Sequence, residues 1–279
     1  MDKTLRCYLK NMNKIKTIAL IAPSGDIRNL DEINSKIEIL SEKFKVKKYF
    51  NPLGALNYLA DSDEKRVSFL EQAFLDDEVD LVLSVRGGYG ALRIVDKINY
   101  DLIKNCNKIY CGSSDASVLL ISLSAKTNIK CFHSLMLANG FIENLEENIK
   151  IIENNIFDLD FEIIKEGVFK GKLWGGNLSS VVSLLSNDKY FPKEDIILFL
   201  EDLNEPIYKI DKMLYEIYRS LLCSKIKGII FGDFYLDDFE ILPLIKEYAN
   251  RFDVPVRLNK NITHKINNVT LPYNQFISI

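Results

Sequence analysis

A turn of small residues, Gly112-Ser113-Ser114-Asp115-Ala116, carries the side chains of this chain best suited to nucleophilic chemistry. It follows the apolar run Ile109–Cys111 and leads directly into another apolar segment, a pattern that predicts a strand, a turn and a helix. Such a turn lifts one side chain clear of a sheet, beside the first backbone N–H groups of the helix. Ser114 stands where a Gly-x-Ser-x-Gly/Ala turn places its nucleophile. The same residues also suit a helix N-cap at Ser114 or Asp115, and the turn alone does not decide between the two.

A serine nucleophile needs a base for its proton, an acid to orient that base, and N–H donors for the oxyanion. The chain has only two histidines, His133 and His264. Glu201 ends the most apolar strand expected in the second half, where a carboxylate either caps amides or orients an imidazole. Ser114, Glu201 and His264 therefore form one possible nucleophile, acid and base. In the alternative interpretation, His264 is a surface residue, and His133 is a polar residue near the site whose hydrogen-bonding groups all have partners.

A glycine loop, Arg86-Gly87-Gly88-Tyr89-Gly90, follows another apolar run, Leu81–Val85. It lacks the Lys-Ser/Thr pair of a phosphate-binding loop and the spacing of a dinucleotide-binding loop. Its glycines allow a close approach of the backbone to another group. The amides of Gly88 and Asp115 would together make an oxyanion hole, and the alternative is a simple tight turn.

The elements expected around these residues alternate between strand and helix, which predicts a parallel sheet covered on both faces. Ligands of such sheets bind at the carboxyl ends of the strands, so the glycine loop, the Ser114 turn and His133 should gather at one edge. The expected strands are Thr17–Ala22, Val46–Phe50, Leu81–Val85, Ile109–Cys111 and Lys130–Phe132, and the helices begin near Leu30, Asp63, Ala91 and Val118.

We expect an N-terminal α/β domain over residues 1–155, a connection over 156–170 and a β-rich C-terminal domain over 171–279. The polar helix Glu143–Asn155 is expected to be solvent-exposed. The second domain is expected to contain strands at Ile196–Leu200 and Ile226–Phe231, helices at Tyr208–Leu222 and Phe239–Tyr248, and a β-rich tail.

Composition narrows the class of protein. A net charge of −3 with interspersed signs gives no basic surface for nucleic acid. The longest apolar runs are strand-sized, so no membrane span is expected, and the polar, basic segment Met1–Lys16 is not a secretory signal. Met12 lies just before the first expected strand, so the preceding residues are either an extension or follow a mis-chosen start. The five cysteines lack metal-ligand spacing and indicate reduced thiols in a cytoplasmic protein.

The chain resembles the LD-carboxypeptidase family in its glycine loop, its Ser114 turn, Leu173-Trp174-Gly175-Gly176-Asn177-Leu178 and Leu200-Glu201-Asp202-Leu203-Asn204-Glu205. The resemblance implies a flavodoxin/Rossmann-like parallel-sheet domain followed by a β-rich α/β domain, with the active site between them. It implies a cytoplasmic, homodimeric serine peptidase without metal or cofactor that releases terminal D-alanine from murein tetrapeptides during cell-wall recycling.

The same resemblance implies roles for individual residues. Ser114 would be the nucleophile, Glu201 the orienting acid and His264 the base, and the amides of Gly88 and Asp115 would form the oxyanion hole. We expect three further residues of the family motifs to contact the muropeptide substrate, namely Arg86, Tyr89 and Trp174.

The chain departs from the family pattern at several places. Thr263 precedes His264 where the family commonly has glycine, and Ser134-Leu135 replaces a Gly-Pro pair. Tyr273-Asn274 follows Leu271-Pro272 where the family usually has Leu-Gly, and Lys212 replaces an arginine. Because lysine lacks the planar fork of arginine, a bidentate carboxylate contact at Lys212 would be weaker.

Two alternatives to the muropeptide carboxypeptidase stay open. One is a family member that hydrolyses a peptidyl-nucleotide antibiotic such as processed microcin C, for which an aromatic clamp on the base would be needed. The other is a non-catalytic peptide-binding relative that retains the fold.

Overall fold

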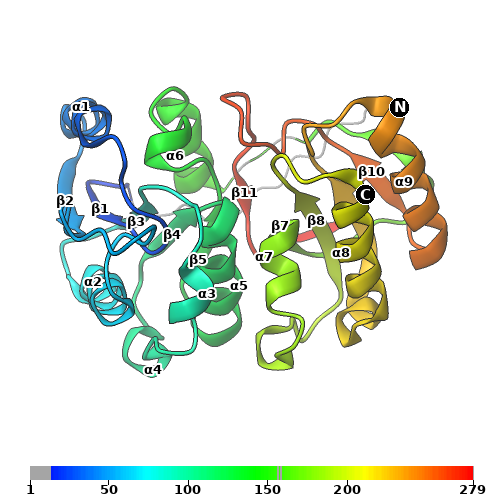
Figure 1. Cartoon of the computed structure of the whole chain (residues 1–279), viewed down its shortest axis with the longest axis horizontal. Coiled ribbons are helices and arrows are strands. Elements are labelled where there is room, and N and C mark those ends of the chain that lie inside the picture. Colours follow the sequence, from blue (N-terminus) through cyan, green and yellow to red (C-terminus); the bar gives the residue numbers. More distant parts are fainter. Residues whose placement is uncertain (1–13, 156, 158, 279) are drawn as a thin grey trace.

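Two six-stranded sheets make up the molecule, and Figure 1 shows them side by side along its long axis. The computed structural model describes residues 14–155, 157 and 159–278. The expectations for Met1–Lys16 therefore lie mostly outside the described residues, as do Cys7 and Met12. Among the described residues, no helix combines the length and apolar character needed to cross a membrane.

The first sheet has the strand order β11-β5-β4-β3-β1-β2 and is parallel except for β11. Because its central strands are covered on both faces, they are apolar throughout rather than alternating. The strands are β1 (Thr17–Ile21), β2 (Lys45–Tyr49), β3 (Leu81–Ser84), β4 (Ile109–Gly112), β5 (Lys130–His133) and β11 (Leu271–Pro272).

The expected helices of this half are present, together with a short unexpected one at residues 100–103, and polar caps explain where three of them begin. Asn29 accepts a hydrogen bond from the amide of Glu32, Ser62 accepts one from the amide of Lys65, and Asn99 accepts one from the amide of Leu102. The helices are α1 (Leu30–Ser41), α2 (Asp63–Leu75), α3 (Ala91–Ile94), α4 (Tyr100–Ile103), α5 (Ser117–Lys126) and α6 (Leu145–Asn154).

Helix α6 corrects one expectation. It was expected to be solvent-exposed, but it buries Leu145, Asn148, Ile151 and Ile152. The buried residues recur at helical spacing, so the polar composition of this helix concealed an apolar face.

The second sheet has the order β12-β7-β8-β9-β10-β6, with antiparallel strands at both edges. Its strands are β6 (Glu162–Lys165), β7 (Lys170–Asn177), β8 (Ile196–Glu201), β9 (Ile226–Phe231), β10 (Val256–Leu258) and β12 (Phe276–Ser278), and its helices are α7 (Leu178–Ser183), α8 (Ile207–Arg219) and α9 (Asp238–Phe252). Strand β6 lies within the segment expected to connect the two parts. The prediction of an α/β chain with two sheet-based halves is confirmed.

The tail of the chain links the two halves. Strand β11 pairs with β5 of the first sheet, and β12, a few residues later, pairs with β7 of the second. In Figure 1 the red strand β11 lies between the two halves. Tyr273, between these strands, accepts a hydrogen bond from the amide of Gly175 (3.1 Å) and donates one to its carbonyl.

Candidate active site

Ser114 lies at a sharp turn at the carboxyl end of β4. Its backbone φ of +55° lies in the left-handed region, which residues other than glycine rarely adopt. A 3₁₀ turn over Ser114–Ala116 then leads into α5. This backbone is typical of a turn that presents a nucleophile, in which a strained residue holds its hydroxyl above the sheet edge.

The glycine loop after β3 packs directly against this turn. A Cβ atom at Gly87 would lie 2.9 Å from both Cβ and Oγ of Ser114, so only glycine permits this approach. The next residue, Gly88, has a φ of +110°. The glycines were expected to let this loop approach another group closely, and in the structure that group is Ser114.

Two buried side chains hold the loop and the turn together. The Asp115 carboxylate accepts a hydrogen bond from the amide of Ala91 at the start of α3 (2.8 Å). Burial raises the pKa of Asp115 above its usual range. Arg66 of α2, 2% exposed, donates to the carbonyls of Gly90 (2.9 Å) and Pro23 and pairs with Asp63 (2.6 Å).

Glu201 and His264 meet behind the turn. Glu201 is the last residue of β8 and its side chain is fully buried. Nε2 of His264 lies 2.8 Å from Oε2 of Glu201, although the angles of this contact fall outside those of a regular hydrogen bond. The imidazole is 7% exposed, so the alternative of a surface His264 is wrong.

The two groups shift each other's protonation. Burial alone would raise the pKa of Glu201, but the imidazoles of His264 and His133 outweigh burial and lower it to about 2. Burial alone would lower the pKa of His264, but the Glu201 carboxylate outweighs it and raises the pKa above 6.5. Each group thus favours the charged form of the other.

The loop that carries His264 is anchored on both sides of the histidine. Asp233, after β9, accepts hydrogen bonds from the Thr263 hydroxyl (3.0 Å) and from the Lys265 ammonium (2.7 Å). Burial alone would raise the pKa of Asp233, but Lys265 and the other hydrogen-bond donors lower it overall. Thr263, where the family commonly has glycine, therefore serves as an anchor for the loop.

Ser114 and His264 line one cavity of about 390 Å³, together with Gly88, Tyr89 and Asp115. The structure thus brings five of the eight residues expected at the site to one cavity, with Glu201 directly behind His264. Ser114 lines this cavity, and among the described residues its hydroxyl has no hydrogen-bond partner.

The three residues expected to contact substrate have different surroundings. Tyr89 lines the cavity, is 48% exposed, and its ring centroid lies 6.1 Å from that of Tyr58. Arg86 is half-buried and donates to the carbonyl of Asp26 (2.6 Å). Trp174 is 2% exposed and is not among the cavity residues, because its ring is buried in the hydrophobic core beside strand β7. Lys212, which the sequence indicates as a position for a carboxylate contact, is 75% exposed on α8 and lies beside Glu216.

Sequence reasoning missed the polar residues that connect α7 to the nucleophile turn. The Ser180 hydroxyl donates to the carbonyl of Ser114 (3.2 Å), and Ser117 accepts from the amide of Asn177 (3.2 Å). Asp202 accepts from the Asn177 side chain (2.9 Å) and the Ser179 amide (3.0 Å). Burial and the adjacent Glu201 raise the pKa of Asp202 to about 6. The available signal was the Gly-Gly-Asn-Leu-Ser-Ser stretch, which ends β7 and begins α7.

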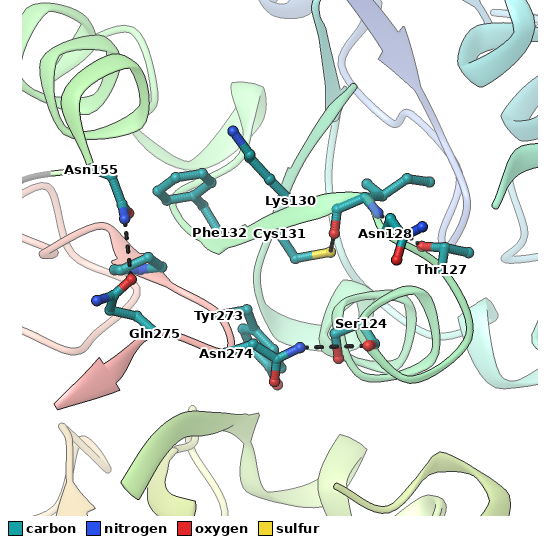
Figure 2. Close-up of a pocket in the computed structure, with 12 residues that line it drawn as sticks. Ser124, Thr127, Asn128, Lys130, Cys131, Phe132, Asn155, Tyr273, Asn274 and Gln275 are labelled. Atoms are coloured by element: carbon teal, nitrogen blue, oxygen red, sulfur yellow. Dashed lines mark hydrogen bonds between the residues drawn. The ribbon is translucent and has the colours of Figure 1, made fainter. Parts of the chain in front are cut away.

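A second cavity of about 390 Å³ lies between β5 and the chain around β11 (Figure 2). Its lining includes Lys130, Phe132, Asn155, Tyr273 and Gln275, and none of the residues expected at the active site. In Figure 2 the Asn155 side chain points to Gln275, to which its amide donates at 3.2 Å. The described part of the chain has no group of three or more His, Cys, Asp or Glu side chains placed to hold a metal.

Comparisons with known proteins identify the family of the chain. Residues 18–134 match the LD-carboxypeptidase N-terminal domain, and residues 170–279 match the LD-carboxypeptidase C-terminal domain. A Rickettsia conorii protein named as a carboxypeptidase is 30% identical, over 95% of this chain and 87% of its own. A Bacillus subtilis protein named as a murein peptide carboxypeptidase is 31% identical, over 81% of this chain and 74% of its own.

The fold is also that of a solved structure, the microcin C7 self-immunity protein. It is 18% identical, with a TM-score of 0.84 over 98% of this chain and 95% of that one. The family models together cover most of the chain. The chain therefore belongs to the LD-carboxypeptidase family, a family of serine carboxypeptidases.

Proposed function

We propose that this protein is a serine-type LD-carboxypeptidase that releases terminal D-alanine from murein tetrapeptides. The observation that carries the proposal is the cavity lined by Ser114, His264, Gly88 and Asp115. Behind it, Oε2 of the buried Glu201 lies 2.8 Å from Nε2 of His264. The relative named as a murein peptide carboxypeptidase supports the substrate class.

In the proposed reaction, Ser114 Oγ adds to the carbonyl carbon of the L-to-D amide while His264 takes the hydroxyl proton. The amides of Gly88 and Asp115 donate to the oxyanion of the tetrahedral intermediate. His264 then returns the proton to the amine of D-alanine as the C–N bond breaks. Water hydrolyses the remaining ester by the same steps, and Glu201 stabilises the imidazolium in both halves of the reaction.

Among the residues expected to contact substrate, the proposal retains Tyr89, which lines the cavity. The Arg86 guanidinium is engaged by the Asp26 carbonyl, and the Trp174 ring lies in the core. The family resemblance further supports a cytoplasmic homodimer, and light scattering of the purified protein tests the dimer.

The test is incubation of the purified protein with a murein tetrapeptide and with its pentapeptide counterpart, followed by mass measurement of the products. We expect loss of one D-alanine from the tetrapeptide. Ser114→Ala should abolish this release while the protein keeps its thermal midpoint, because only the nucleophile is removed. Ser124→Ala on α5 is the matched control, since its hydroxyl bonds to the carbonyl of Ile121 far from the turn. Full activity of Ser114→Ala would remove Ser114 from its proposed role.

A second candidate is hydrolysis of a peptidyl nucleotide, favoured by the fold similarity to the microcin C7 self-immunity protein. The exposed Tyr58–Tyr89 pair beside the cavity offers an aromatic surface for a base. Processed microcin C, supplied in place of the tetrapeptide, distinguishes the two substrates. Labelling of Ser114 by an active-site serine reagent separates both enzymes from a non-catalytic peptide binder, which has no activated hydroxyl.

A further inference from the structure

The Glu201 carboxylate has an imidazole beside each of its two oxygens. Oε2 faces His264 at 2.8 Å, and Oε1 lies 3.5 Å from Nε2 of His133. The side chains of Glu201 and His133 are both 0% exposed. The proposed catalytic set uses His264 only, which leaves His133 as a buried polar group without an assigned role.

His133 belongs to the half of the molecule that carries the nucleophile. It ends β5 and is in register with Gly112 of β4, two residues before Ser114. Glu201 ends β8 in the other sheet, in register with Asn177 of β7. The contact between His133 and Glu201 therefore joins the two sheet edges that must be aligned for Ser114, Glu201 and His264 to work together.

Burial constrains what the His133 ring does there. A buried carboxylate needs a donor for each oxygen, and both nitrogens of the His133 ring are buried with no hydrogen-bond partner in the described part of the chain. The ring packs edge-on against Phe199, with centroids 5.3 Å apart, which limits its rotation. A proton on Nε2 is the arrangement that supplies a donor to Oε1, at a distance that a small adjustment turns into a hydrogen bond.

We propose that His133 is a positioning residue whose ring donates its Nε2–H to Oε1 of Glu201. This contact holds the carboxylate with Oε2 toward His264 and couples the acid of one sheet to the nucleophile of the other. The inference rests on the proposed function for its consequence in catalysis, whereas the His133–Glu201 contact itself is independent of any substrate.

The contact is tested first without substrate. Because the chain has only two histidines, ¹⁵N-detected spectra of the imidazoles contain two rings, and His133→Phe identifies them. We expect His133 to carry a proton on Nε2, with a downfield Nε2 proton resonance. Glu201→Gln should move that proton upfield, because a neutral amide oxygen is a weaker acceptor. An Nδ1–H tautomer, or a His133 resonance that Glu201→Gln leaves in place, overturns the proposal.

The consequence for catalysis is tested with two replacements of His133. His133→Phe keeps the ring volume without a donor and should lower kcat/KM by about 10- to 100-fold, through kcat rather than KM. His133→Gln places an amide N–H at a similar reach and should recover most of that loss. Ser134→Ala is the matched control, because the neighbouring hydroxyl bonds to Thr270 and not to Glu201.

These outcomes separate the two proposals. Absence of wild-type activity on every peptide would overturn the proposed function and leave the spectroscopic test intact. Wild-type kcat and pH profile in a folded His133→Phe would overturn the positioning role. If His133→Phe does not fold, His264→Phe assigns the two rings instead, and the wild-type and Glu201→Gln spectra then decide the question.

Discussion

Ser114 combines the proposed reacting hydroxyl with a backbone conformation that costs a non-glycine residue roughly 1–2 kcal/mol. The surrounding packing maintains it, through the α7 contact to its carbonyl and the glycine loop at its side chain. The contacts that maintain the strained backbone of Ser114 therefore also fix the position of its hydroxyl.

This strain predicts a difference between two inactive variants. Ser114→Gly removes the free-energy cost of a left-handed backbone at residue 114, but it also increases the conformational freedom of the unfolded chain. We therefore expect the free energy of unfolding of Ser114→Gly to be about 0.5–1 kcal/mol higher than that of Ser114→Ala. Urea denaturation of both proteins measures this difference. A Ser114→Gly protein less stable than Ser114→Ala would contradict the strain argument.

The His264–Glu201 pair predicts the pH dependence of activity. The base works only when neutral, and the raised pKa of His264 keeps the ring protonated to higher pH. The value of kcat/KM should therefore rise with pH, with a midpoint above 6.5. Glu201→Gln removes the negative charge that raises this pKa, so the midpoint should fall while kcat drops by about 10⁴-fold. A profile that is flat from pH 6 to 9 would be inconsistent with His264 as the base.

At the scale of elements, the carboxyl ends of β3, β4 and β5 place the glycine loop, the nucleophile turn and His133 at one edge. The helices α2, α3 and α7 then fix the separation of these loops through Arg66, Asp115 and Ser180. The catalytic geometry depends on how closely the loops approach.

Gly87→Ala tests that approach. The added methyl group would lie 2.9 Å from Ser114 Oγ, so the loop or the hydroxyl must shift, and we expect kcat/KM to fall by about 100-fold. Gly54→Ala is the control, since its methyl group would clash with Asp61 and not with Ser114. Thermal midpoints measured beside the kinetics should show a loss of stability in Gly54→Ala without a matching loss of kcat in the folded protein. Unchanged kinetics in Gly87→Ala would show that the approach is not needed.

At the scale of the whole molecule, the proposed nucleophile Ser114 comes from one sheet and the proposed acid Glu201 from the other, so the proposed reaction requires a fixed junction between the halves. The tail supplies part of it, since β11 joins the first sheet and the Tyr273 hydroxyl bonds to the backbone of Gly175 in the second. The Tyr273 ring also packs edge-on against Phe199, with centroids 5.8 Å apart.

Tyr273→Phe removes this hydroxyl and leaves the buried amide and carbonyl of Gly175 without their partner. We expect the free energy of unfolding to fall by about 1–3 kcal/mol. Tyr208→Phe, at a residue 68% exposed on α8, should leave it within about 0.5 kcal/mol of wild type. Equal unfolding midpoints for the two variants in urea would exclude Tyr273 as a link between the sheets.

Local pattern alone was enough to predict most helices and strands, because an apolar run or a helical period reflects burial that the segment undergoes in any compact fold. It also located the Ser114 turn, by its run of small residues, and the glycine loop, in which Gly88 and Gly90 adopt positive φ. The short helix α4, the strand β6 and the buried face of α6 were not predicted, since tertiary packing rather than their own pattern determines them.

Only the tertiary structure decided which distant side chains meet. Nothing local to His264 or His133 distinguishes a partner of Glu201 from a surface or core histidine, and the distances of 2.8 and 3.5 Å depend on the pairing of two sheets. For the same reason Trp174 and Arg86, prominent in their motifs, contact the core and the Asp26 carbonyl, whereas Tyr89 lines the cavity. Sequence periodicity records which residues are buried, but the direction of a side chain at a strand end depends on the elements packed against it.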